Sequence, residues 1–242
     1  MSACDSTLHA PIAPHFPSKN APSASSSSSS ATAGDEAQEP TSIAALIHTL
    51  GLLKHPEGGY FVETDRDARR VPNPFQDDSS YVRHGIVPTA AQTRDGDDTT
   101  RCASTTIYYL LTPGNPQGVF HLNRGRTVHT LHQGRGRYVI IHADEVDGTR
   151  GRNKARIETF VVGHNVTRGE KMQWIVEGGK FKASLLLPDR ADETGSENGL
   201  LISETVIPGF EFRDHDFMTN DQLIALLDED QAKELGWLVR KT

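Results

Sequence analysis

The sequence lacks most of the features that mark secreted, membrane-spanning or nucleic-acid-binding proteins. Only two cysteines are present, Cys4 and Cys102, and this pair predicts no structural disulfide and a reducing compartment. No apolar run approaches the roughly 18 residues that span a bilayer. The N-terminus lacks the basic start and apolar core of a secretory signal. We therefore predict a cytoplasmic protein, with a nuclear location left open.

Blocks of basic residues that would mark an anionic surface as partner are also missing. The net charge is −7, with acidic and basic side chains interspersed. Because nucleic acids and anionic membranes attract clustered Lys and Arg, we expect neither a nucleic-acid nor a membrane partner.

Large apolar side chains are scarce in the first forty residues. This segment contains six consecutive serines, Ser25 to Ser30, among Ala and Pro. It cannot bury enough apolar area to offset the entropy lost on ordering. We predict a disordered tail over residues 1–40, and a role of this tail in recruiting partners is one of the open alternatives.

Two helices are expected near the ends of the ordered part. The spacing of Ile43, Leu46, Ile47 and Leu50 predicts a helix that Thr41 or Ser42 caps and Gly51 ends. A closing helix is predicted over residues 219–242, capped by Thr219 or Asn220.

Strands dominate the region between these helices. Residues 65–101 are polar and predict a long loop with one short edge strand near residues 81–87. From residue 102 on, short β-branched and aromatic runs alternate with turns that contain Gly or Pro, which is typical of an antiparallel sandwich or barrel. We predict an all-β domain over residues 41–218.

Four segments resemble one known family. They are HPEGGYFVET at 55–64, STTIYYLL at 104–111, GEKMQWIVEGG at 169–179 and LISETVIPGFEFRDHDF at 201–217. Together they resemble the cupin type 5 family, whose function is unknown. The resemblance implies a single-domain, RmlC-like cupin jelly-roll β-barrel with a pocket at one end, often assembled as a homodimer.

The metal site that the wider cupin superfamily implies is mostly lost here. Aligning the first cupin motif on His121 puts Asn123 and Thr127 at the second His and the Glu positions, and Lys182 falls on the His of the second motif. An amide binds a cation weakly, a hydroxyl poorly, and an ammonium repels it. We therefore expect no metal and no cofactor, although His121 and His129 with a carboxylate such as Glu63 remain an alternative divalent site.

A barrel without metal can still hold a small polar ligand in its mouth. The ligand is expected to be sugar-like, carboxylated or phosphorylated. Lys182 can hold an anionic group, and Tyr60 and Glu63 have opposite strand parity, so only one of them can point inward. The predicted ligand-binding residues are His121, Asn123, Thr127, Gln173, Lys182, Glu63 and Tyr60.

Catalysis is the competing interpretation of the same pocket. His129 is the best general base because imidazole titrates near neutrality, and Tyr108 is the candidate acid, in the manner of metal-independent cupin epimerases. Each residue also has a structural interpretation, His129 as a buried histidine with a satisfied partner and Tyr108 as part of the core. The sequence leaves four functions open: ligand binding, a metal-independent isomerase or epimerase, the less favoured metal-dependent enzyme, and an interaction module whose tail recruits partners.

Overall fold

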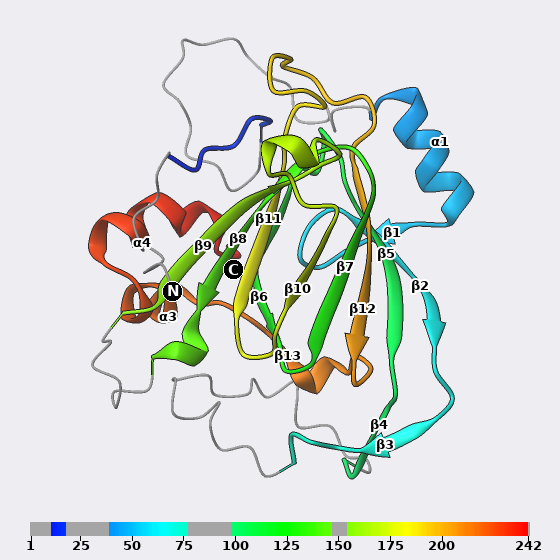
Figure 1. The fold of residues 1–242 in the computed structure, drawn as a ribbon, viewed down its shortest axis with the longest axis vertical. Helices are drawn as coiled ribbons and strands as arrows, with labels where there is room; N and C mark the ends of the chain where they lie inside the picture. Colours follow the sequence, from blue (N-terminus) through cyan, green and yellow to red (C-terminus); the bar gives the residue numbers. More distant parts are fainter. Residues whose placement is uncertain (1–10, 18–38, 77–97, 147–153, 242) are drawn as a thin grey trace.

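The computed structural model describes residues 11–17, 39–76, 98–146 and 154–241, and within them two antiparallel sheets face each other (Figure 1). One sheet has six strands in the order β1-β2-β5-β12-β7-β10, and the other has five in the order β13-β6-β11-β8-β9. The first sheet consists of β1 (Leu53–Lys54), β2 (Tyr60–Arg66), β5 (Thr105–Leu111), β12 (Leu200–Ile207), β7 (Arg126–Gln133) and β10 (Gln173–Val176). The second consists of β13 (His215–Phe217), β6 (Gln117–Asn123), β11 (Phe181–Leu186), β8 (Gly136–His142) and β9 (Arg156–Val162).

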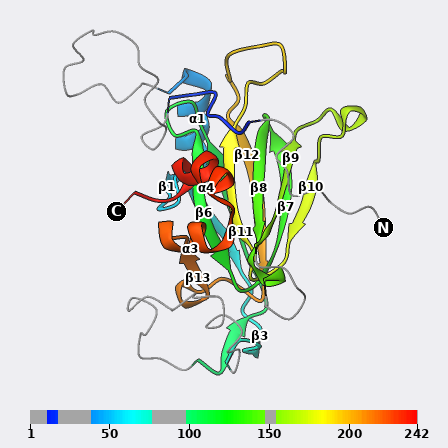
Figure 2. The ribbon, with the colours of Figure 1, turned by 90° about the vertical axis from the view of Figure 1, so that its left-hand side faces the viewer.

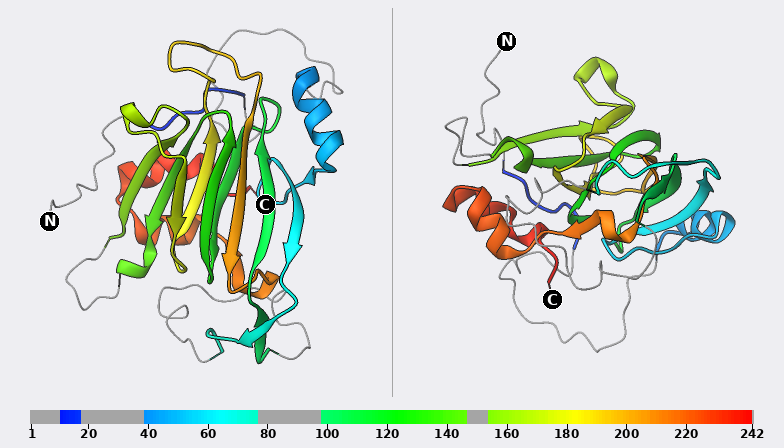
Figure 3. Two further views of the ribbon diagram at one scale, coloured as in Figure 1. Left: turned by 45° about the vertical axis from the view of Figure 1, so that its right-hand side comes forward. Right: turned by 90° about the horizontal axis from the view of Figure 1, so that it is seen from below.

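Strand sequences set which side chains enter the space between the sheets. In β7, Thr127, His129 and Leu131 are buried, whereas the residues between them are more exposed. In β10, Trp174 and Val176 are buried and their neighbours are exposed. This period of two is what a strand with one solvated face requires. The view from below in Figure 3 shows the two sheets facing each other.

Two apolar layers lie on the two faces of the five-stranded sheet. Between the sheets, Tyr109, Tyr138, Trp174 and Ile202 belong to one buried cluster. On the other face of the sheet, Phe120 and Phe181 pack against the C-terminal helices, which Figure 2 shows beside β6 and β11. Buried polar side chains also lie between the sheets, among them His129 and Lys182, and they form the candidate site.

The first helix, α1 (Thr41–Leu50), starts where the sequence predicts. Its N-cap, however, is Pro40, and Thr41 is already helical. Gly51 ends the helix in the left-handed conformation with φ 65°, as a C-terminal glycine should. Ile43 is buried in a small cluster with Leu110 on the outer face of the six-stranded sheet.

The C-terminal segment forms two short helices instead of the one predicted. These are α3 (Asn220–Leu226) and α4 (Glu229–Leu235), followed by the 3-10 turn η5 (Gly236–Leu238). Thr219 caps α3 through a capping box, as expected. The extended backbone of Leu227 then ends α3, and Asp228 caps α4. The bend between the two helices lets Leu223, Leu226 and Leu235 all pack on the same face of the sheet.

Part of the segment predicted as disordered packs on the domain. Ile12 is only 4% exposed within the apolar layer beside the C-terminal helices, and its amide donates to Glu234 Oε1 at 2.6 Å. Phe16 packs against the cluster between the sheets. Residues 1–10 and 18–38 of the predicted tail lie outside the described residues.

The polar stretch after β2 contains more strand than expected. A ribbon of β3 (Arg70–Pro72) and β4 (Thr100–Cys102) forms at its two ends. The edge strand predicted near residues 81–87 lies outside the described residues. The remaining short elements are the 3-10 turns η2 (Ala143–Glu145), η3 (Val166–Arg168) and η4 (Phe212–Asp214).

Candidate functional site

A buried ammonium, carboxylate and imidazole meet between the two sheets. Lys182 Nζ on β11 lies 2.6 Å from Glu204 Oε2 on β12 and 2.9 Å from His129 Nε2 on β7. Glu204 Oε2 is also 3.3 Å from His129 Nε2. The exposed fractions are 2% for Lys182, 0% for His129 and 8% for Glu204. We call these three residues the central triad.

Strand pairing explains why the triad forms. His129 and Glu204 are direct partners in the antiparallel pair β7–β12, so their side chains project from the same face of the sheet. Lys182 comes from the facing sheet, where the alternation Lys182, Ser184 and Leu186 points inward while Phe181 and Ala183 enter the outer layer. Two sheets therefore contribute opposite charges to one enclosed point.

The charge states in the triad follow from burial and proximity. Burial by itself would raise the pKa of Glu204, but the Lys182 ammonium and His129 hold that pKa well below its usual value. Burial lowers the pKa of His129, and the nearby Lys182 lowers it further. The triad is thus an ion pair between Lys182 and Glu204 with a neutral imidazole that accepts from Lys182.

Aromatic rings enclose the triad on one side. The Trp174 ring stacks on His129 with centroids 5.0 Å apart, and Tyr138 meets Trp174 edge-on at 4.7 Å. Burial, followed by the charge of Glu204, raises the pKa of Tyr138 well above 10. Burial and the charge of Glu57 do the same to the pKa of Tyr109. Both phenols therefore stay protonated and able to donate.

A second buried cluster surrounds Glu57, in the turn before β2. Its Oε1 lies 2.8 Å from His215 Nε2, and its Oε2 lies 3.2 Å from His121 Nδ1 and 3.7 Å from His55 Nδ1. Burial would raise the pKa of Glu57, but His121, His55 and His215 lower it to about 2. We call Glu57, His55, His121 and His215 the Glu57 cluster.

His121 connects the Glu57 cluster to the central triad. It is the direct strand partner of Lys182 in the pair β6–β11. Burial lowers the pKa of His121 to about 3, against the pull of Glu57 and with help from the Lys182 charge. The interior therefore holds two carboxylates and one ammonium, with His121 and His129 neutral.

The structure brings some of the predicted site residues to this interior. His121, His129 and Lys182 are there, and Thr127 is 1% exposed near the end of the barrel. Asn123 donates from Nδ2 to Thr127 Oγ1 at 3.5 Å, and its buried Oδ1 has no partner among the described residues. These five positions surround one polar end of the barrel.

Four other predicted residues lie elsewhere, and strand parity turns three of them, Tyr108, Gln173 and Tyr60, outward. Tyr108 packs on the α1 side of β5, whereas its neighbour Tyr109 points inward. Gln173 is exposed, since Trp174 takes the inward position of β10. The expectation that Tyr108 and Gln173 face the barrel interior is wrong.

Tyr60 and Glu63 do not reach the interior either. Tyr60 packs on the α1 side, where its hydroxyl accepts from Asn115 Nδ2 at 3.2 Å. Glu63 is exposed and pairs with Arg66 Nη2 at 2.7 Å. A β-bulge between Glu63 and Asp65 shifts the register of β2 against β5, and the pairing resumes at Asp65. Neither Tyr60 nor Glu63 lines the pocket as predicted.

Sequence reasoning missed the two carboxylates. Glu204 could have been found, because it is the one acid in an alternating apolar series with Leu200, Ile202 and Val206. Glu57 lies in a turn without periodicity, and His215 follows it by 158 positions. No local pattern identifies that pair.

The strand order, the two facing sheets and the polar interior define a cupin jelly-roll barrel. The chain belongs to the cupin superfamily (DUF985), whose family model matches residues 44–218. It is 40% identical over 202 residues to the uncharacterized protein YML079W of Saccharomyces cerevisiae, covering 83% of this chain and 88% of that protein. A hypothetical protein from Leishmania major has a similar structure, with TM-score 0.61, 28% identity, and coverage of 82% of this chain and 98% of that one.

One further relative matches over a shorter stretch. A fucose-specific lectin of Arthroderma benhamiae is 42% identical over 79 residues, which are 33% of this chain and 19% of that protein. No helix within the residues that the structure describes is long and apolar enough to span a membrane. The homodimer and the cytoplasmic location stay predictions.

The divalent metal that the cupin fold implies does not fit these residues. The Lys182 ammonium lies in the middle of the central triad and already donates hydrogen bonds to Glu204 Oε2 and His129 Nε2. In the described part of the chain, no group of three or more His, Cys, Asp or Glu side chains is placed to hold a metal ion. The donor set instead suits hydrogen bonding.

Proposed function

We propose that this barrel binds a small, uncharged, hydroxyl-rich molecule at the central triad. The main support for this proposal is the buried Lys182 ammonium, which donates hydrogen bonds to Glu204 and His129 and has a third N–H group. Within the described residues, Lys182 Nζ makes no third hydrogen bond. A buried ammonium with an unused donor favours a ligand oxygen as its partner.

The charge balance favours an uncharged ligand over the carboxylated and phosphorylated alternatives. Glu57 and Glu204 are two buried carboxylates against the one ammonium of Lys182, and the pKa values of His121 and His129 are both lowered. An anion would add repulsion in a medium that screens charge poorly.

Hydroxyl groups meet the remaining hydrogen-bonding needs. A hydroxyl donates and accepts at once, so a polyol can accept from Lys182 and donate to the unpartnered Oδ1 of Asn123. The match to part of a fucose-specific lectin is in keeping with a sugar-like ligand.

Binding is favoured over catalysis by the hydrogen bonding of His129. Its Nε2 accepts from Lys182, and its ring is fully buried under Trp174. The partner acid suggested by the sequence, Tyr108, lies on the opposite face of its sheet. A metal-independent isomerase that uses His129 as base would need both arrangements to change.

The test is ligand-induced stabilisation of the full chain by neutral monosaccharides, with fucose, galactose, mannose and glucose as probes. A ligand at about 100 times its Kd stabilises by about 2.7 kcal/mol, which raises Tm by about 5 to 10 °C in a domain of this size. Asn123→Ala should weaken this shift, whereas Lys180→Met, whose lysine pairs with Asp144 near the surface, should not. If none of the four sugars raises Tm while organic anions do, the proposal of an uncharged ligand is wrong.

A further inference from the structure

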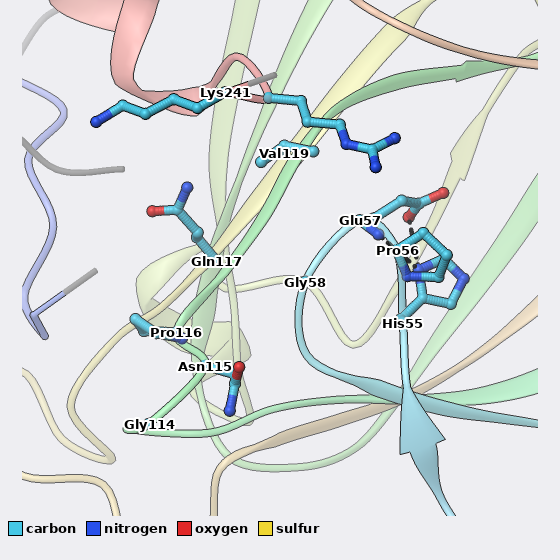
Figure 4. Close-up of a pocket in the computed structure, with 11 residues that line it drawn as sticks. His55, Pro56, Glu57, Gly58, Gly114, Asn115, Pro116, Gln117, Val119 and Lys241 are labelled. Atoms are coloured by element: carbon cyan, nitrogen blue, oxygen red, sulfur yellow. Dashed lines mark hydrogen bonds and ion pairs between the residues drawn. The ribbon is translucent and has the colours of Figure 1, made fainter. Parts of the chain in front are cut away.

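A cavity of about 220 Å³ opens beside the turn that precedes β2. Its walls are the turn 55–58, the loop 114–117 between β5 and β6, and the C-terminal residues Arg240 and Lys241. Figure 4 shows Glu57 and Lys241 on different sides of it. Its volume is below the range of pockets for drug-sized molecules, so it suits a ligand of a few heavy atoms.

One wall of this cavity carries two positive charges. Arg240 and Lys241 are both exposed, and neither has an ion-pair partner among the residues that the structure describes. The Arg240 guanidinium lies over the Phe217 ring, 4.4 Å from its centroid. This contact positions the guanidinium while leaving its N–H groups free for a planar anion.

The opposite wall carries the Glu57 carboxylate. Each carboxylate oxygen can accept about two hydrogen bonds. Glu57 Oε1 accepts from His215 Nε2, and Oε2 lies within reach of His121 Nδ1. His55 Nδ1 accepts from the Glu57 amide at 3.2 Å, so this nitrogen gives no proton to the carboxylate. Glu57 thus retains acceptor capacity that can face the cavity.

The geometry points to a second binding site here, for a small amino-carboxylate such as an α-amino acid. The ligand carboxylate would bind the Arg240 guanidinium in bidentate fashion, with Lys241 close by, and the ligand ammonium would face Glu57. A simple anion would leave Glu57 unmatched, and a simple amine would leave both cations unmatched. The site shares no ligand-contacting residue with the one proposed at Lys182 and does not depend on it.

Isothermal titration of the full chain tests this site with glycine, alanine, serine and threonine as probes. At least one is expected to bind, and its affinity should exceed that of the matched probes lacking one charge, propionate and ethylamine, by about tenfold or more. Arg240→Gln should weaken binding by about tenfold or more. The variant should still fold, because Arg240 is exposed and makes no ion pair in the described structure.

Two control variants show whether the amino acid binds in this cavity and not elsewhere on the protein. Arg190→Gln removes a guanidinium whose side chain is 77% exposed elsewhere on the surface, and it should leave the affinity unchanged. Asn123→Ala alters the interior proposed for hydroxylated ligands, so it should also leave amino-acid binding intact. Absence of binding by all four amino acids overturns the inference, as does equal affinity for propionate or an unchanged affinity of Arg240→Gln.

Discussion

Lys182 and Glu204 belong to opposite sheets, and their Nζ and Oε2 atoms lie 2.6 Å apart inside the barrel. This contact joins the two layers through charge, beside the apolar cluster that also lies between them. Removing one partner leaves the other charge buried without compensation, which costs more than the pair contributes.

Lys182→Met is therefore expected to lower the free energy of unfolding by about 3 to 5 kcal/mol, measured by urea denaturation. Lys180→Met, directly before β11, should cost less, because its partner Asp144 is 37% exposed and stays hydrated when the lysine is removed. The double variant Lys182→Met with Glu204→Leu should recover part of the loss, because it removes both charges. Equal costs for Lys180 and Lys182 would show that the ion pair is not buried in solution.

Stability should fall with decreasing pH in two windows. Folding lowers the pKa of His121 from 6.5 to about 3, so the unfolded chain binds the additional proton and stability decreases as pH falls below 6.5. Folding lowers the pKa of Glu57 from 4.5 to about 2, so its contribution is present above 4.5 and is lost as pH falls toward 2.

Urea midpoints measured across this range check both windows. His121→Gln should flatten the upper window and leave part of the lower one. Midpoints that stay constant between pH 6.5 and 4.5 would contradict a buried neutral His121.

Two neighbouring tyrosines should respond differently to loss of their hydroxyls. Tyr109 is 3% exposed and donates to Gly58 O at 2.9 Å, so Tyr109→Phe should cost about 1 kcal/mol by removing the donor of a partly buried carbonyl. Tyr108→Phe, on the outer face of the same strand, should change stability by less than about 0.5 kcal/mol. The reverse order in thermal unfolding would place Tyr108, not Tyr109, in the interior.

Gly58 and Gly51 form a second matched pair. Both have positive φ, but a Cβ at Gly58 would lie 2.1 Å from Gln117 O, whereas a Cβ at Gly51 meets nothing within 4 Å. Gly51→Ala should cost about 1 to 2 kcal/mol of backbone strain, and Gly58→Ala at least about 3 kcal/mol. Similar costs would mean that the turn carrying Glu57 can move away from β6.

Ile12 should stabilise the domain although it precedes the predicted boundary by 29 positions. Its side chain is 4% exposed, so Ile12→Ala is expected to cost about 2 to 5 kcal/mol. The exposed Ile224, at 63%, provides the control, and Ile224→Ala should cost under about 1 kcal/mol. If Ile12→Ala leaves the free energy of unfolding unchanged, residues 11–17 do not pack on the domain in solution.

The sequence predicted the barrel well because the patterns that indicate it are local. Alternation in β7 and β12, the turn glycines and the helix over residues 41–50 each depend on neighbours a few positions apart. The position of Lys182 in the interior followed from motif spacing. His129 was predicted in the same pocket, but Glu204 was missed. Glu204 and His129 are partners within one sheet, and Lys182 meets them from the facing sheet.

The predicted inward orientation of Tyr108 and Gln173 was wrong for a different reason. Tyr108 and Gln173 each stand beside an inward aromatic residue, Tyr109 or Trp174, and a register error of one position exchanges the two faces. The family motif did not specify that register.

The hydrogen bond from Ile12 to Glu234 spans 222 positions and ties the first described segment to a C-terminal helix. During synthesis, the N-terminal segment emerges long before α4 exists, so its docking place is completed only when nearly the whole chain is available. Contacts of such sequence separation form late and slow folding. The N-terminal segment should therefore be among the last parts of the domain to be protected from a protease as the newly made chain folds.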